Sequence, residues 1–272
     1  MMHSPNSLIF LHIPKAAGTT LQQIIERQYP TEANYTFGAS ATESVAAFKA
    51  LPEEKRHAIR VLKGHMGFGL HTYLREPYTY ITFVRHPVSR YISYYHHVLR
   101  SPVHYLYEEK RMPRNTSLEA FVRGQFTIEL NNGQTRLLAG EDGLWQETPF
   151  GEWPPDMLEK AKANLDAFFS VVGVAERFDE SLLLLQRRLG WRNILYAREN
   201  VAPQTTAVLP PNLRQEIERQ NELDLALYRY AQSRLEAEIK RQGLRFQLLL
   251  RLFRRQNRRF QQRLDGASQQ RA

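Results

Sequence analysis

The stretch LIFLHIPKAAGTTLQQII, residues 8–25, joins a short apolar run to a helical pattern through a loop of small residues. The apolar run, residues 8–13, has the length of a buried strand. After the break at residues 14–18, apolar residues return between Leu21 and Ile25 with the spacing of one helix face. A strand that leads through small residues into a helix favours anion binding, because the N–H groups of the first helical turn point at the loop.

The rest of the chain continues this alternation of apolar runs and helical patterns. Further strands are predicted at residues 59–62, 79–84 and 169–174, with a short fifth strand at 194–196. Helices are predicted at residues 19–28, 42–50, 87–99, 117–140, 155–168, 176–189 and 211–240, and a loop at 101–116. Strands that alternate with helices favour the α/β class, with a parallel β-sheet flanked by helices on both faces. Ligands of such sheets bind beyond the carboxyl ends of the strands, which are followed here by segments 14–20, 63–66 and 85–93.

The composition limits the class of protein. The chain has 272 residues, of which 42% are hydrophobic, and this is enough for one large folded domain or two small ones. The absence of cysteine excludes disulfides, thiolate metal sites and a cysteine nucleophile. The first apolar run is too short for a signal peptide, and no stretch has the length of a membrane span. We therefore expect a cytoplasmic protein.

The positive charge lies mainly at the C-terminal end. Residues 241–272 contain nine Arg and one Asp, a balance of +8, so the rest of the chain contributes only +1 of the net +9. This division predicts a catalytic domain at residues 1–240 and a basic tail at 241–272. Because the body is almost neutral, we do not expect nucleic acid as a partner.

The loop after the first strand contains several groups that bind phosphate. Lys15 supplies a point charge, Gly18 gives room for the backbone to approach an anion, and Thr19 and Thr20 add hydroxyl donors. A P-loop NTPase would place Gly-Lys-Ser/Thr at the end of the loop, whereas here the lysine precedes the glycine. The alternative is an ordinary strand–helix connection in which Thr19 or Thr20 only caps the helix.

A second candidate anion site follows the strand at residues 79–84. Arg85 ends this strand, and Ser93 lies two turns into the next helix. A guanidinium and a hydroxyl in these positions can bind the same phosphate. Taken alone, the pair can equally be a structural salt bridge and a packing contact.

In this order and around these strands, the two motifs resemble those of the PAPS-dependent sulfotransferases, which use 3′-phosphoadenosine 5′-phosphosulfate as donor. The chain looks most similar to the branch of the heparan sulfate 2-O- and 6-O-sulfotransferases and their bacterial relatives. Residues 14–20 resemble that family's 5′-phosphosulfate loop, and Arg85 and Ser93 match its 3′-phosphate-binding arginine and serine. Segments 131–136 and 169–177 also resemble this branch, and the likeness covers residues 8–235.

The resemblance implies a P-loop-like nucleotide-binding sulfotransferase fold, PAPS as donor, PAP as product, and no metal. Lys15, Gly18, Thr19, Thr20, Arg85 and Ser93 would bind the donor. Lys15 would also stabilise the charge of the leaving oxygen during an in-line displacement. The acceptor would be a hydroxyl, expected on a carbohydrate.

His65, which follows the predicted strand at 59–62, is the candidate general base. A neutral imidazole can take a hydroxyl proton. The heparan sulfate 2-O branch has His-Gly-His at the matching place, but here Lys63 replaces the first histidine. Competing candidates for the base are His12, His71, His86 and Glu76.

Two other functions stay open at this point. One is a nucleotide-dependent kinase, which the missing Gly-Lys-Ser/Thr and the missing magnesium-binding aspartate disfavour. The other is a non-catalytic nucleotide-binding module, which the retained Lys15 and His65 disfavour.

The tail has the pattern of a basic amphipathic helix. Leu249, Leu252, Phe253, Phe260 and Leu264 share one face of a helical wheel, and Arg251, Arg254, Arg255, Arg258 and Arg259 share the other. The apolar face either packs on the catalytic domain, or the helix attaches the protein peripherally to an anionic membrane surface or to an anionic polymer.

Overall fold

The computed structural model describes residues 7–38, 41–140, 149–197 and 209–269. Its centre is a sheet of five parallel strands in the order β2-β3-β1-β4-β5. The strands are β1 Ser7–Leu11, β2 Asn34–Thr36, β3 Val61–Gly64, β4 Tyr78–Val84 and β5 Phe169–Val174. Every residue of β1 is buried, because this strand lies between β3 and β4 and both of its faces are covered.

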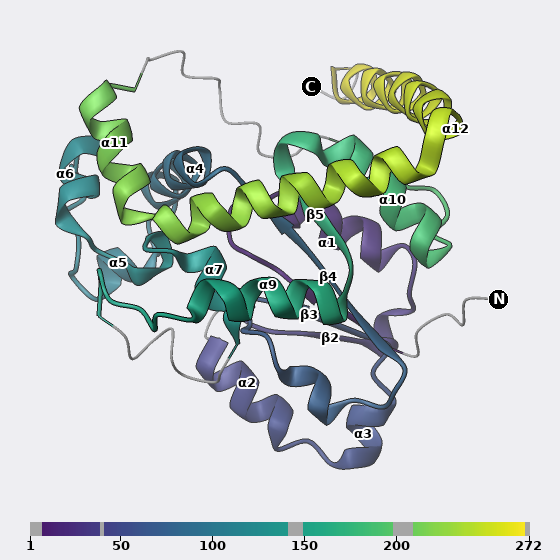
Figure 1. Cartoon of the computed structure of the whole chain (residues 1–272), viewed down its shortest axis with the longest axis horizontal. Coiled ribbons are helices and arrows are strands. Elements are labelled where there is room, and N and C mark those ends of the chain that lie inside the picture. The colour runs from purple at the N-terminus through teal and green to yellow at the C-terminus, as the bar shows by residue number, and fades with distance from the viewer. Residues whose placement is uncertain (1–6, 39–40, 141–148, 198–208, 270–272) are drawn as a thin grey trace.

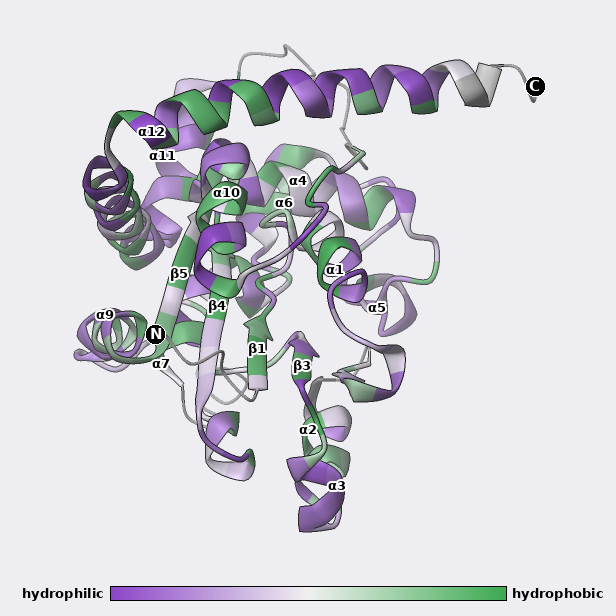
Figure 2. Ribbon diagram, turned by 90° about the vertical axis from the view of Figure 1, so that its right-hand side faces the viewer, coloured by the Kyte–Doolittle hydropathy of each residue, from purple (hydrophilic) through white to green (hydrophobic). Residues whose placement is uncertain are grey.

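Helices cover both faces of the sheet (Figures 1 and 2). On one face lie α7 Gly133–Ala139, α9 Met157–Phe168 and the first part of α12 Glu222–Gln269, and on the other lies α1 Gly18–Glu26. The remaining helices are α2 Ala41–Lys49, α3 Glu53–His57, α4 Pro87–Arg100, α5 Tyr105–Glu108, α6 Leu118–Gly124, α10 Phe178–Leu189 and α11 Pro211–Gln220. Short 3₁₀ turns occupy Thr31–Ala33, Leu70–Tyr73, Ile128–Leu130 and Ala175–Arg177. The predicted α/β class and the parallel sheet are confirmed.

Several predicted elements were wrong in detail. The fifth strand is at 34–36, at the edge of the sheet, and not at 194–196, where no strand forms. The backbone N–H of Tyr196 instead donates to the Asn257 side chain at 2.9 Å, so this segment pairs with a helix. The helix predicted at 117–140 is interrupted after Gly124, where Gln125 has a left-handed φ of 50°. The predicted loop at 101–116 contains the short helix α5.

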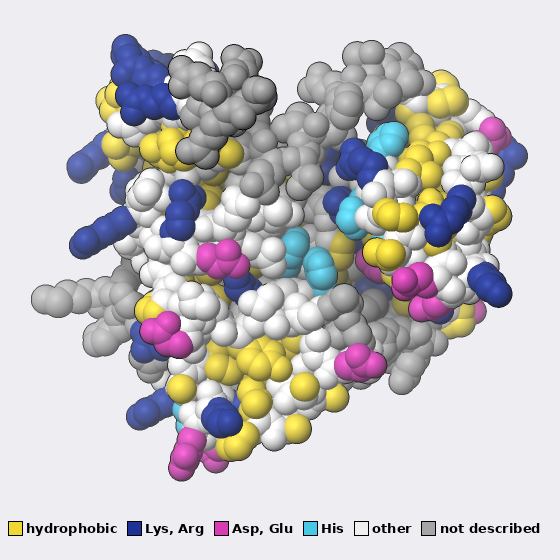
Figure 3. Space-filling model, turned by 180° about the vertical axis from the view of Figure 1, so that it is seen from behind, with side chains coloured by type: hydrophobic (Ala, Val, Ile, Leu, Met, Phe, Trp, Pro, Cys, Tyr) yellow, Lys and Arg dark blue, Asp and Glu magenta, His cyan; other side chains and the backbone are white. Residues whose placement is uncertain are grey.

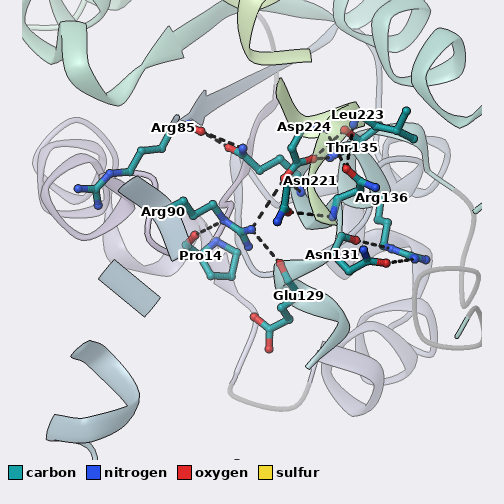
Figure 4. Close-up of polar contacts among 12 residues, drawn as sticks. Pro14, Arg85, Arg90, Glu129, Asn131, Thr135, Arg136, Asn221, Leu223 and Asp224 are labelled. Carbon is teal, nitrogen blue, oxygen red and sulfur yellow. Dashed lines mark hydrogen bonds and ion pairs between the residues drawn. The ribbon is translucent and has the colours of Figure 1, made fainter. Parts of the chain in front are cut away.

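The helix predicted at 211–240 is two helices, and the second is joined to α7 by reciprocal capping (Figure 4). The Asn132 side-chain oxygen accepts the N–H groups of Leu223 and Asp224 at the start of α12. In return, the Asp224 carboxylate accepts the N–H groups of Gln134 and Thr135 at the start of α7. Each helix thus satisfies donors that the other leaves unpaired, which places the N-termini of α7 and α12 against each other.

Arg90 connects this helix junction to the loop after β1 (Figure 4). Its side chain is 2% exposed and lies 3.9 Å from the Asp224 carboxylate. Its Nε donates to the Pro14 carbonyl at 3.0 Å, and one terminal nitrogen donates to the Glu129 carbonyl at 2.8 Å. The buried guanidinium thus contacts three segments that are distant in the sequence. Breaking any of these contacts would leave a buried polar group unpaired, which is unfavourable.

The tail packs against the rest of the protein, but only some residues of the predicted apolar face are buried there. Helix α12 bends at Gly243, where φ is 69°, and its second part lies across α10. Phe246, Leu250 and Phe253 are buried in the main core, whereas Leu252 is 56% exposed. The predicted apolar face was therefore wrong for Leu252 and also for Leu264, which is exposed. None of the described helices is long and apolar enough to span a bilayer.

Candidate active site

One large cavity lies at the carboxyl ends of the sheet strands and has a volume of about 1540 Å³. Figure 3 shows the hollow on the face opposite to that of Figure 1, with histidine side chains at its edge. The loops after β1, β3 and β4 all contribute to it. Every site residue that the sequence predicted lines this one cavity, namely Lys15, Gly18, Thr19, Thr20, His65, Arg85 and Ser93. The volume exceeds that of a typical single-ligand pocket, so two substrates have room to meet in it.

The loop after β1 turns sharply at two residues in the left-handed region. Lys15 has a φ of 64° and Ala17 a φ of 65°, and the helix α1 begins at Gly18. No side chain caps this helix at Ala17, so the N–H groups of its first turn stay available to a ligand in the cavity.

Gly18 is required by the packing of His12. A Cβ atom at this position would lie 1.7 Å from the His12 Nε2 atom, well inside van der Waals contact. The imidazole of His12 therefore occupies the space that the side chain of any residue other than glycine at position 18 would need. This brings the last residues of the β1 segment directly against the start of α1.

The cavity holds positive charge that is poorly solvated. An Arg85 terminal nitrogen donates to the Lys15 carbonyl at 3.1 Å. Burial lowers the pKa of Lys15, and the positive charges of Arg100 and Arg85 lower it further. Burial also lowers the pKa of Arg85, against the opposite effect of Glu176. Burial and mutual repulsion both disfavour the charged forms of these side chains. An anionic ligand would reduce the repulsion and replace the lost solvation, so the site favours such a ligand.

Arg85 is positioned through its backbone. The Gln134 side-chain oxygen accepts the Arg85 N–H at 2.9 Å, and the Gln134 side-chain nitrogen donates to the Arg85 carbonyl at 2.9 Å. The sequence analysis included residue 134 in segment 131–136, which resembles the sulfotransferases, but gave it no role.

His65 is oriented by a hydrogen bond that defines its tautomer. Its Nδ1 lies 2.8 Å from the His12 carbonyl oxygen. A carbonyl can only accept, so Nδ1 carries the proton and Nε2 of the neutral ring is left as a proton acceptor. The ring centres of His12 and His65 are 4.4 Å apart. Burial lowers the pKa of His12, and His65 and Lys15 lower it further, which favours a neutral His12.

Lys63, which replaces a histidine of the resembled branch, has a structural position. Its ammonium forms an ion pair with Glu26 of α1, and its side chain is 3% exposed. Neither residue is among the described residues that line the cavity. Lys63 therefore does not substitute for the missing histidine.

Three of the competing base candidates lie elsewhere: the described lining of the cavity does not include His71, His86 or Glu76. The His71 ring packs against Phe168 and its Nδ1 lies 3.0 Å from the Tyr80 hydroxyl. The imidazole of His86 contacts the ring of Tyr228 at 5.2 Å between centres. Of the alternatives, only His12 lines the cavity.

The structure adds His97 to the site, one turn beyond Ser93 on α4. Burial lowers its pKa to about 4, with the charge of Lys15 as the next cause. His97 is therefore neutral at ordinary pH and is a second possible proton acceptor. The spacing of Ser93 and His97, which share a helix face, was the sequence signal that could have identified it.

The cavity wall beyond His97 is polar and aromatic. The Glu129 carboxylate accepts the hydroxyls of Tyr94 at 3.0 Å and Tyr105 at 3.1 Å. The ring of His104 lies 4.7 Å from that of Tyr105. Several residues of segment 101–116, which was predicted to be a loop, line the cavity.

Comparison with known proteins identifies relatives. Residues 1–136 match the sequence model of the sulfotransferase family. Galactose-3-O-sulfotransferase 3 of Bos taurus is 29% identical over 248 residues, which cover 82% of this chain and 55% of the relative. Its Homo sapiens counterpart is 27% identical over 263 residues, covering 87% of this chain and 58% of the relative. The chain thus spans little more than half the length of these curated relatives.

Two solved structures are also similar. A sulfotransferase from Alicyclobacillus acidocaldarius superposes with a TM-score of 0.43 and 16% identity, covering 84% of this chain and 95% of the other. A mouse sulfotransferase in complex with PAP has a TM-score of 0.31 and 14% identity, covering 84% of this chain and 89% of the other. The family predicted from the sequence is confirmed by the family match, whereas the heparan sulfate branch stays a prediction, because the relatives named above are galactose sulfotransferases.

Proposed function

Since this chain belongs to the sulfotransferase family, we propose that it transfers a sulfuryl group from PAPS to a hydroxyl of a galactose-containing glycan. The main support for the proposal is that residues at the ends of three strands line one cavity. Lys15 after β1, His65 after β3 and Arg85 after β4 all line it. Anion-binding groups and a proton acceptor thus face the same space.

The residues present fit the donor. The first turn of α1 and Lys15 suit the 5′-phosphosulfate, because both line the cavity and a helix N-terminus and an ammonium bind anions. Arg85 and Ser93 suit the 3′-phosphate, since a guanidinium offers a planar fork of donors to phosphate oxygens. Burial is the main cause of the lowered pKa values of Lys15 and Arg85, and it supports this assignment because an anionic ligand would compensate for the lost solvation of both cations.

PAPS, when bound, supplies an activated sulfuryl group. In the proposed reaction, Lys15 stabilises the negative charge that develops on the leaving phosphate oxygen. His65 accepts the proton of the acceptor hydroxyl at Nε2, while its Nδ1–H remains bonded to the His12 carbonyl. That bond keeps the ring in one orientation during the transfer.

Two observations support a glycan as acceptor. The curated relatives are galactose-3-O-sulfotransferases. The cavity wall beyond His97 combines the Tyr105 ring with the polar side chains of Glu108, Gln125 and Thr127. Aromatic faces and hydrogen-bonding groups together suit a sugar, which has an apolar ring face and many hydroxyls.

The test is transfer of labelled sulfate from PAPS to matched glycans. We expect product with N-acetyllactosamine and none with the analogue whose galactose 3-hydroxyl is replaced by hydrogen. Equal labelling of both sugars would show that the acceptor is a hydroxyl other than the galactose 3-hydroxyl, but the chain would still be a sulfotransferase. Absence of transfer to any hydroxyl acceptor would favour the non-catalytic module, and phosphate transfer from ATP would favour the kinase.

A further inference from the structure

The second part of α12 carries apolar side chains on its outward face as well as on its buried face. Leu244, Leu248 and Leu252 are 85%, 59% and 56% exposed. They are four residues apart, so they form one line along the helix, which we call the leucine stripe. The opposite side of the helix carries the residues that pack into the core, Phe246, Leu250 and Phe253.

The leucine stripe is not needed for packing. Six large hydrophobic side chains are exposed among the described residues, and three of them form this stripe. Solvent-facing helix positions are ordinarily polar, and a concentration of exposed leucines on consecutive turns marks a surface that binds something apolar.

The charge around the stripe identifies the kind of partner. Between residues 241 and 264 the sequence has eight arginines and no acidic residue. Arg245, Arg251, Arg255 and Arg259 are all exposed, and at 100° per residue they lie on the same side of the helix as the leucine stripe. Figure 3 shows Lys and Arg side chains massed beside hydrophobic ones at the upper left, where the end of α12 lies.

This combination favours a membrane over other partners. A second copy of the same face would bring arginines against arginines, which is unfavourable. A soluble polyanion would bind the arginines but would leave the leucines in water. An anionic lipid surface satisfies both, because leucines enter the boundary between headgroups and acyl chains while guanidinium groups bind the phosphates.

We propose that the outward face of residues 244–259 binds the surface of an anionic membrane, with the helix lying in the plane of the interface. The proposal does not depend on the sulfotransferase reaction. Arg254 is excluded from the contact surface, because it pairs with Asp179 and Glu180 and lines the cavity. The inner face stays on the body, so the same helix holds the enzyme at the membrane without unfolding from it.

The test is sedimentation of the full chain with lipid vesicles at low salt. We expect binding to vesicles of phosphatidylcholine with phosphatidylserine and none to phosphatidylcholine alone. Replacing the leucine stripe by glutamine (Leu244→Gln, Leu248→Gln and Leu252→Gln together) should weaken binding at least about tenfold. The matched control is Leu99→Gln, which removes an exposed leucine outside the tail and should bind like the unaltered protein.

A second variant tests the contribution of the arginines. Changing Arg251, Arg255 and Arg259 to glutamine should weaken vesicle binding on the order of a hundredfold. Thermal unfolding and PAP binding should be unchanged in both variants, since the altered side chains are exposed; if the triple leucine variant does not fold, Leu248→Gln alone is used. Full-length protein that ignores anionic vesicles would overturn the proposal. So would a leucine variant that binds them normally, because the partner would then be recognised by charge alone.

Discussion

Gln134 pairs with the backbone of Arg85 through both ends of its side-chain amide, each at 2.9 Å. The backbone of Gln134 is itself held by the Asp224 carboxylate at the junction of α7 and α12. A candidate phosphate-binding arginine is therefore positioned from a helix junction outside the sheet. The consequence is that substitutions in this buried network should affect donor binding.

We expect Gln134→Ala to weaken binding of adenosine 3′,5′-bisphosphate, because the end of β4 loses two hydrogen bonds. The lost bonds should also lower the free energy of unfolding by about 1–3 kcal/mol. Calorimetry and denaturant unfolding measure the two effects. Gln220→Ala is the matched control, since it removes another buried amide, bonded to the Val122 carbonyl, without touching Arg85. Unchanged nucleotide affinity in folded Gln134→Ala would contradict the positioning role.

Arg85→Ala should discriminate between nucleotides. If Arg85 binds the 3′-phosphate, its loss should cost on the order of 2 kcal/mol in binding of adenosine 3′,5′-bisphosphate and much less for adenosine 5′-monophosphate. Titration calorimetry with both ligands measures the difference. Arg27→Ala serves as control, because that guanidinium donates to the Leu195 carbonyl and Arg27 is not among the residues lining the cavity. An equal loss for the two nucleotides would refute the assignment.

Lys15→Ala and His65→Ala should each reduce the rate of sulfate transfer at least about a hundredfold, the usual scale for charge stabilisers and general bases. His65→Ala should leave donor affinity nearly intact, since the base acts on the acceptor, whereas Lys15→Ala should weaken it. Initial rates with labelled PAPS and calorimetry separate the two effects. If His65→Ala retains most activity and His97→Ala loses it, His97 is the base.

Stability should fall on acidification through His97. Its pKa in the folded protein is about 4, against 6.5 for the ordinary side chain. Between these values the unfolded chain binds the proton and the folded protein does not, so the free energy of unfolding decreases as pH falls from about 6.5 to about 4. His97→Gln should show a shallower decrease, measured by urea unfolding at several pH values. Identical pH slopes in the two proteins would contradict the lowered pKa.

The local sequence was sufficient for the elements that form the core of the sheet and for placing the predicted site residues at its carboxyl edge. Four of the five strands follow from apolar runs, because strands buried on both faces consist mainly of apolar residues. The three segments expected at strand ends do meet in one cavity, because carboxyl ends of parallel strands share an edge. The short edge strand at 34–36 was missed, since it is only three residues long and partly exposed, and so carries no apolar run.

Only the tertiary structure decided the contacts between distant segments. The bond from Gln134 to Arg85 spans 49 positions and the cap from Asn132 to Asp224 spans 92, and neither pair has a signal in local periodicity. The tail shows the same division between local pattern and tertiary contact. Its sequence predicted a basic helix with one apolar face, but a helical wheel cannot tell which apolar side chains are buried. Packing against α10 and Tyr196 set the rotation of the helix, turning Phe253 inward and Leu252 outward, because burial depends on the shape of the partner surface as well as on the pattern.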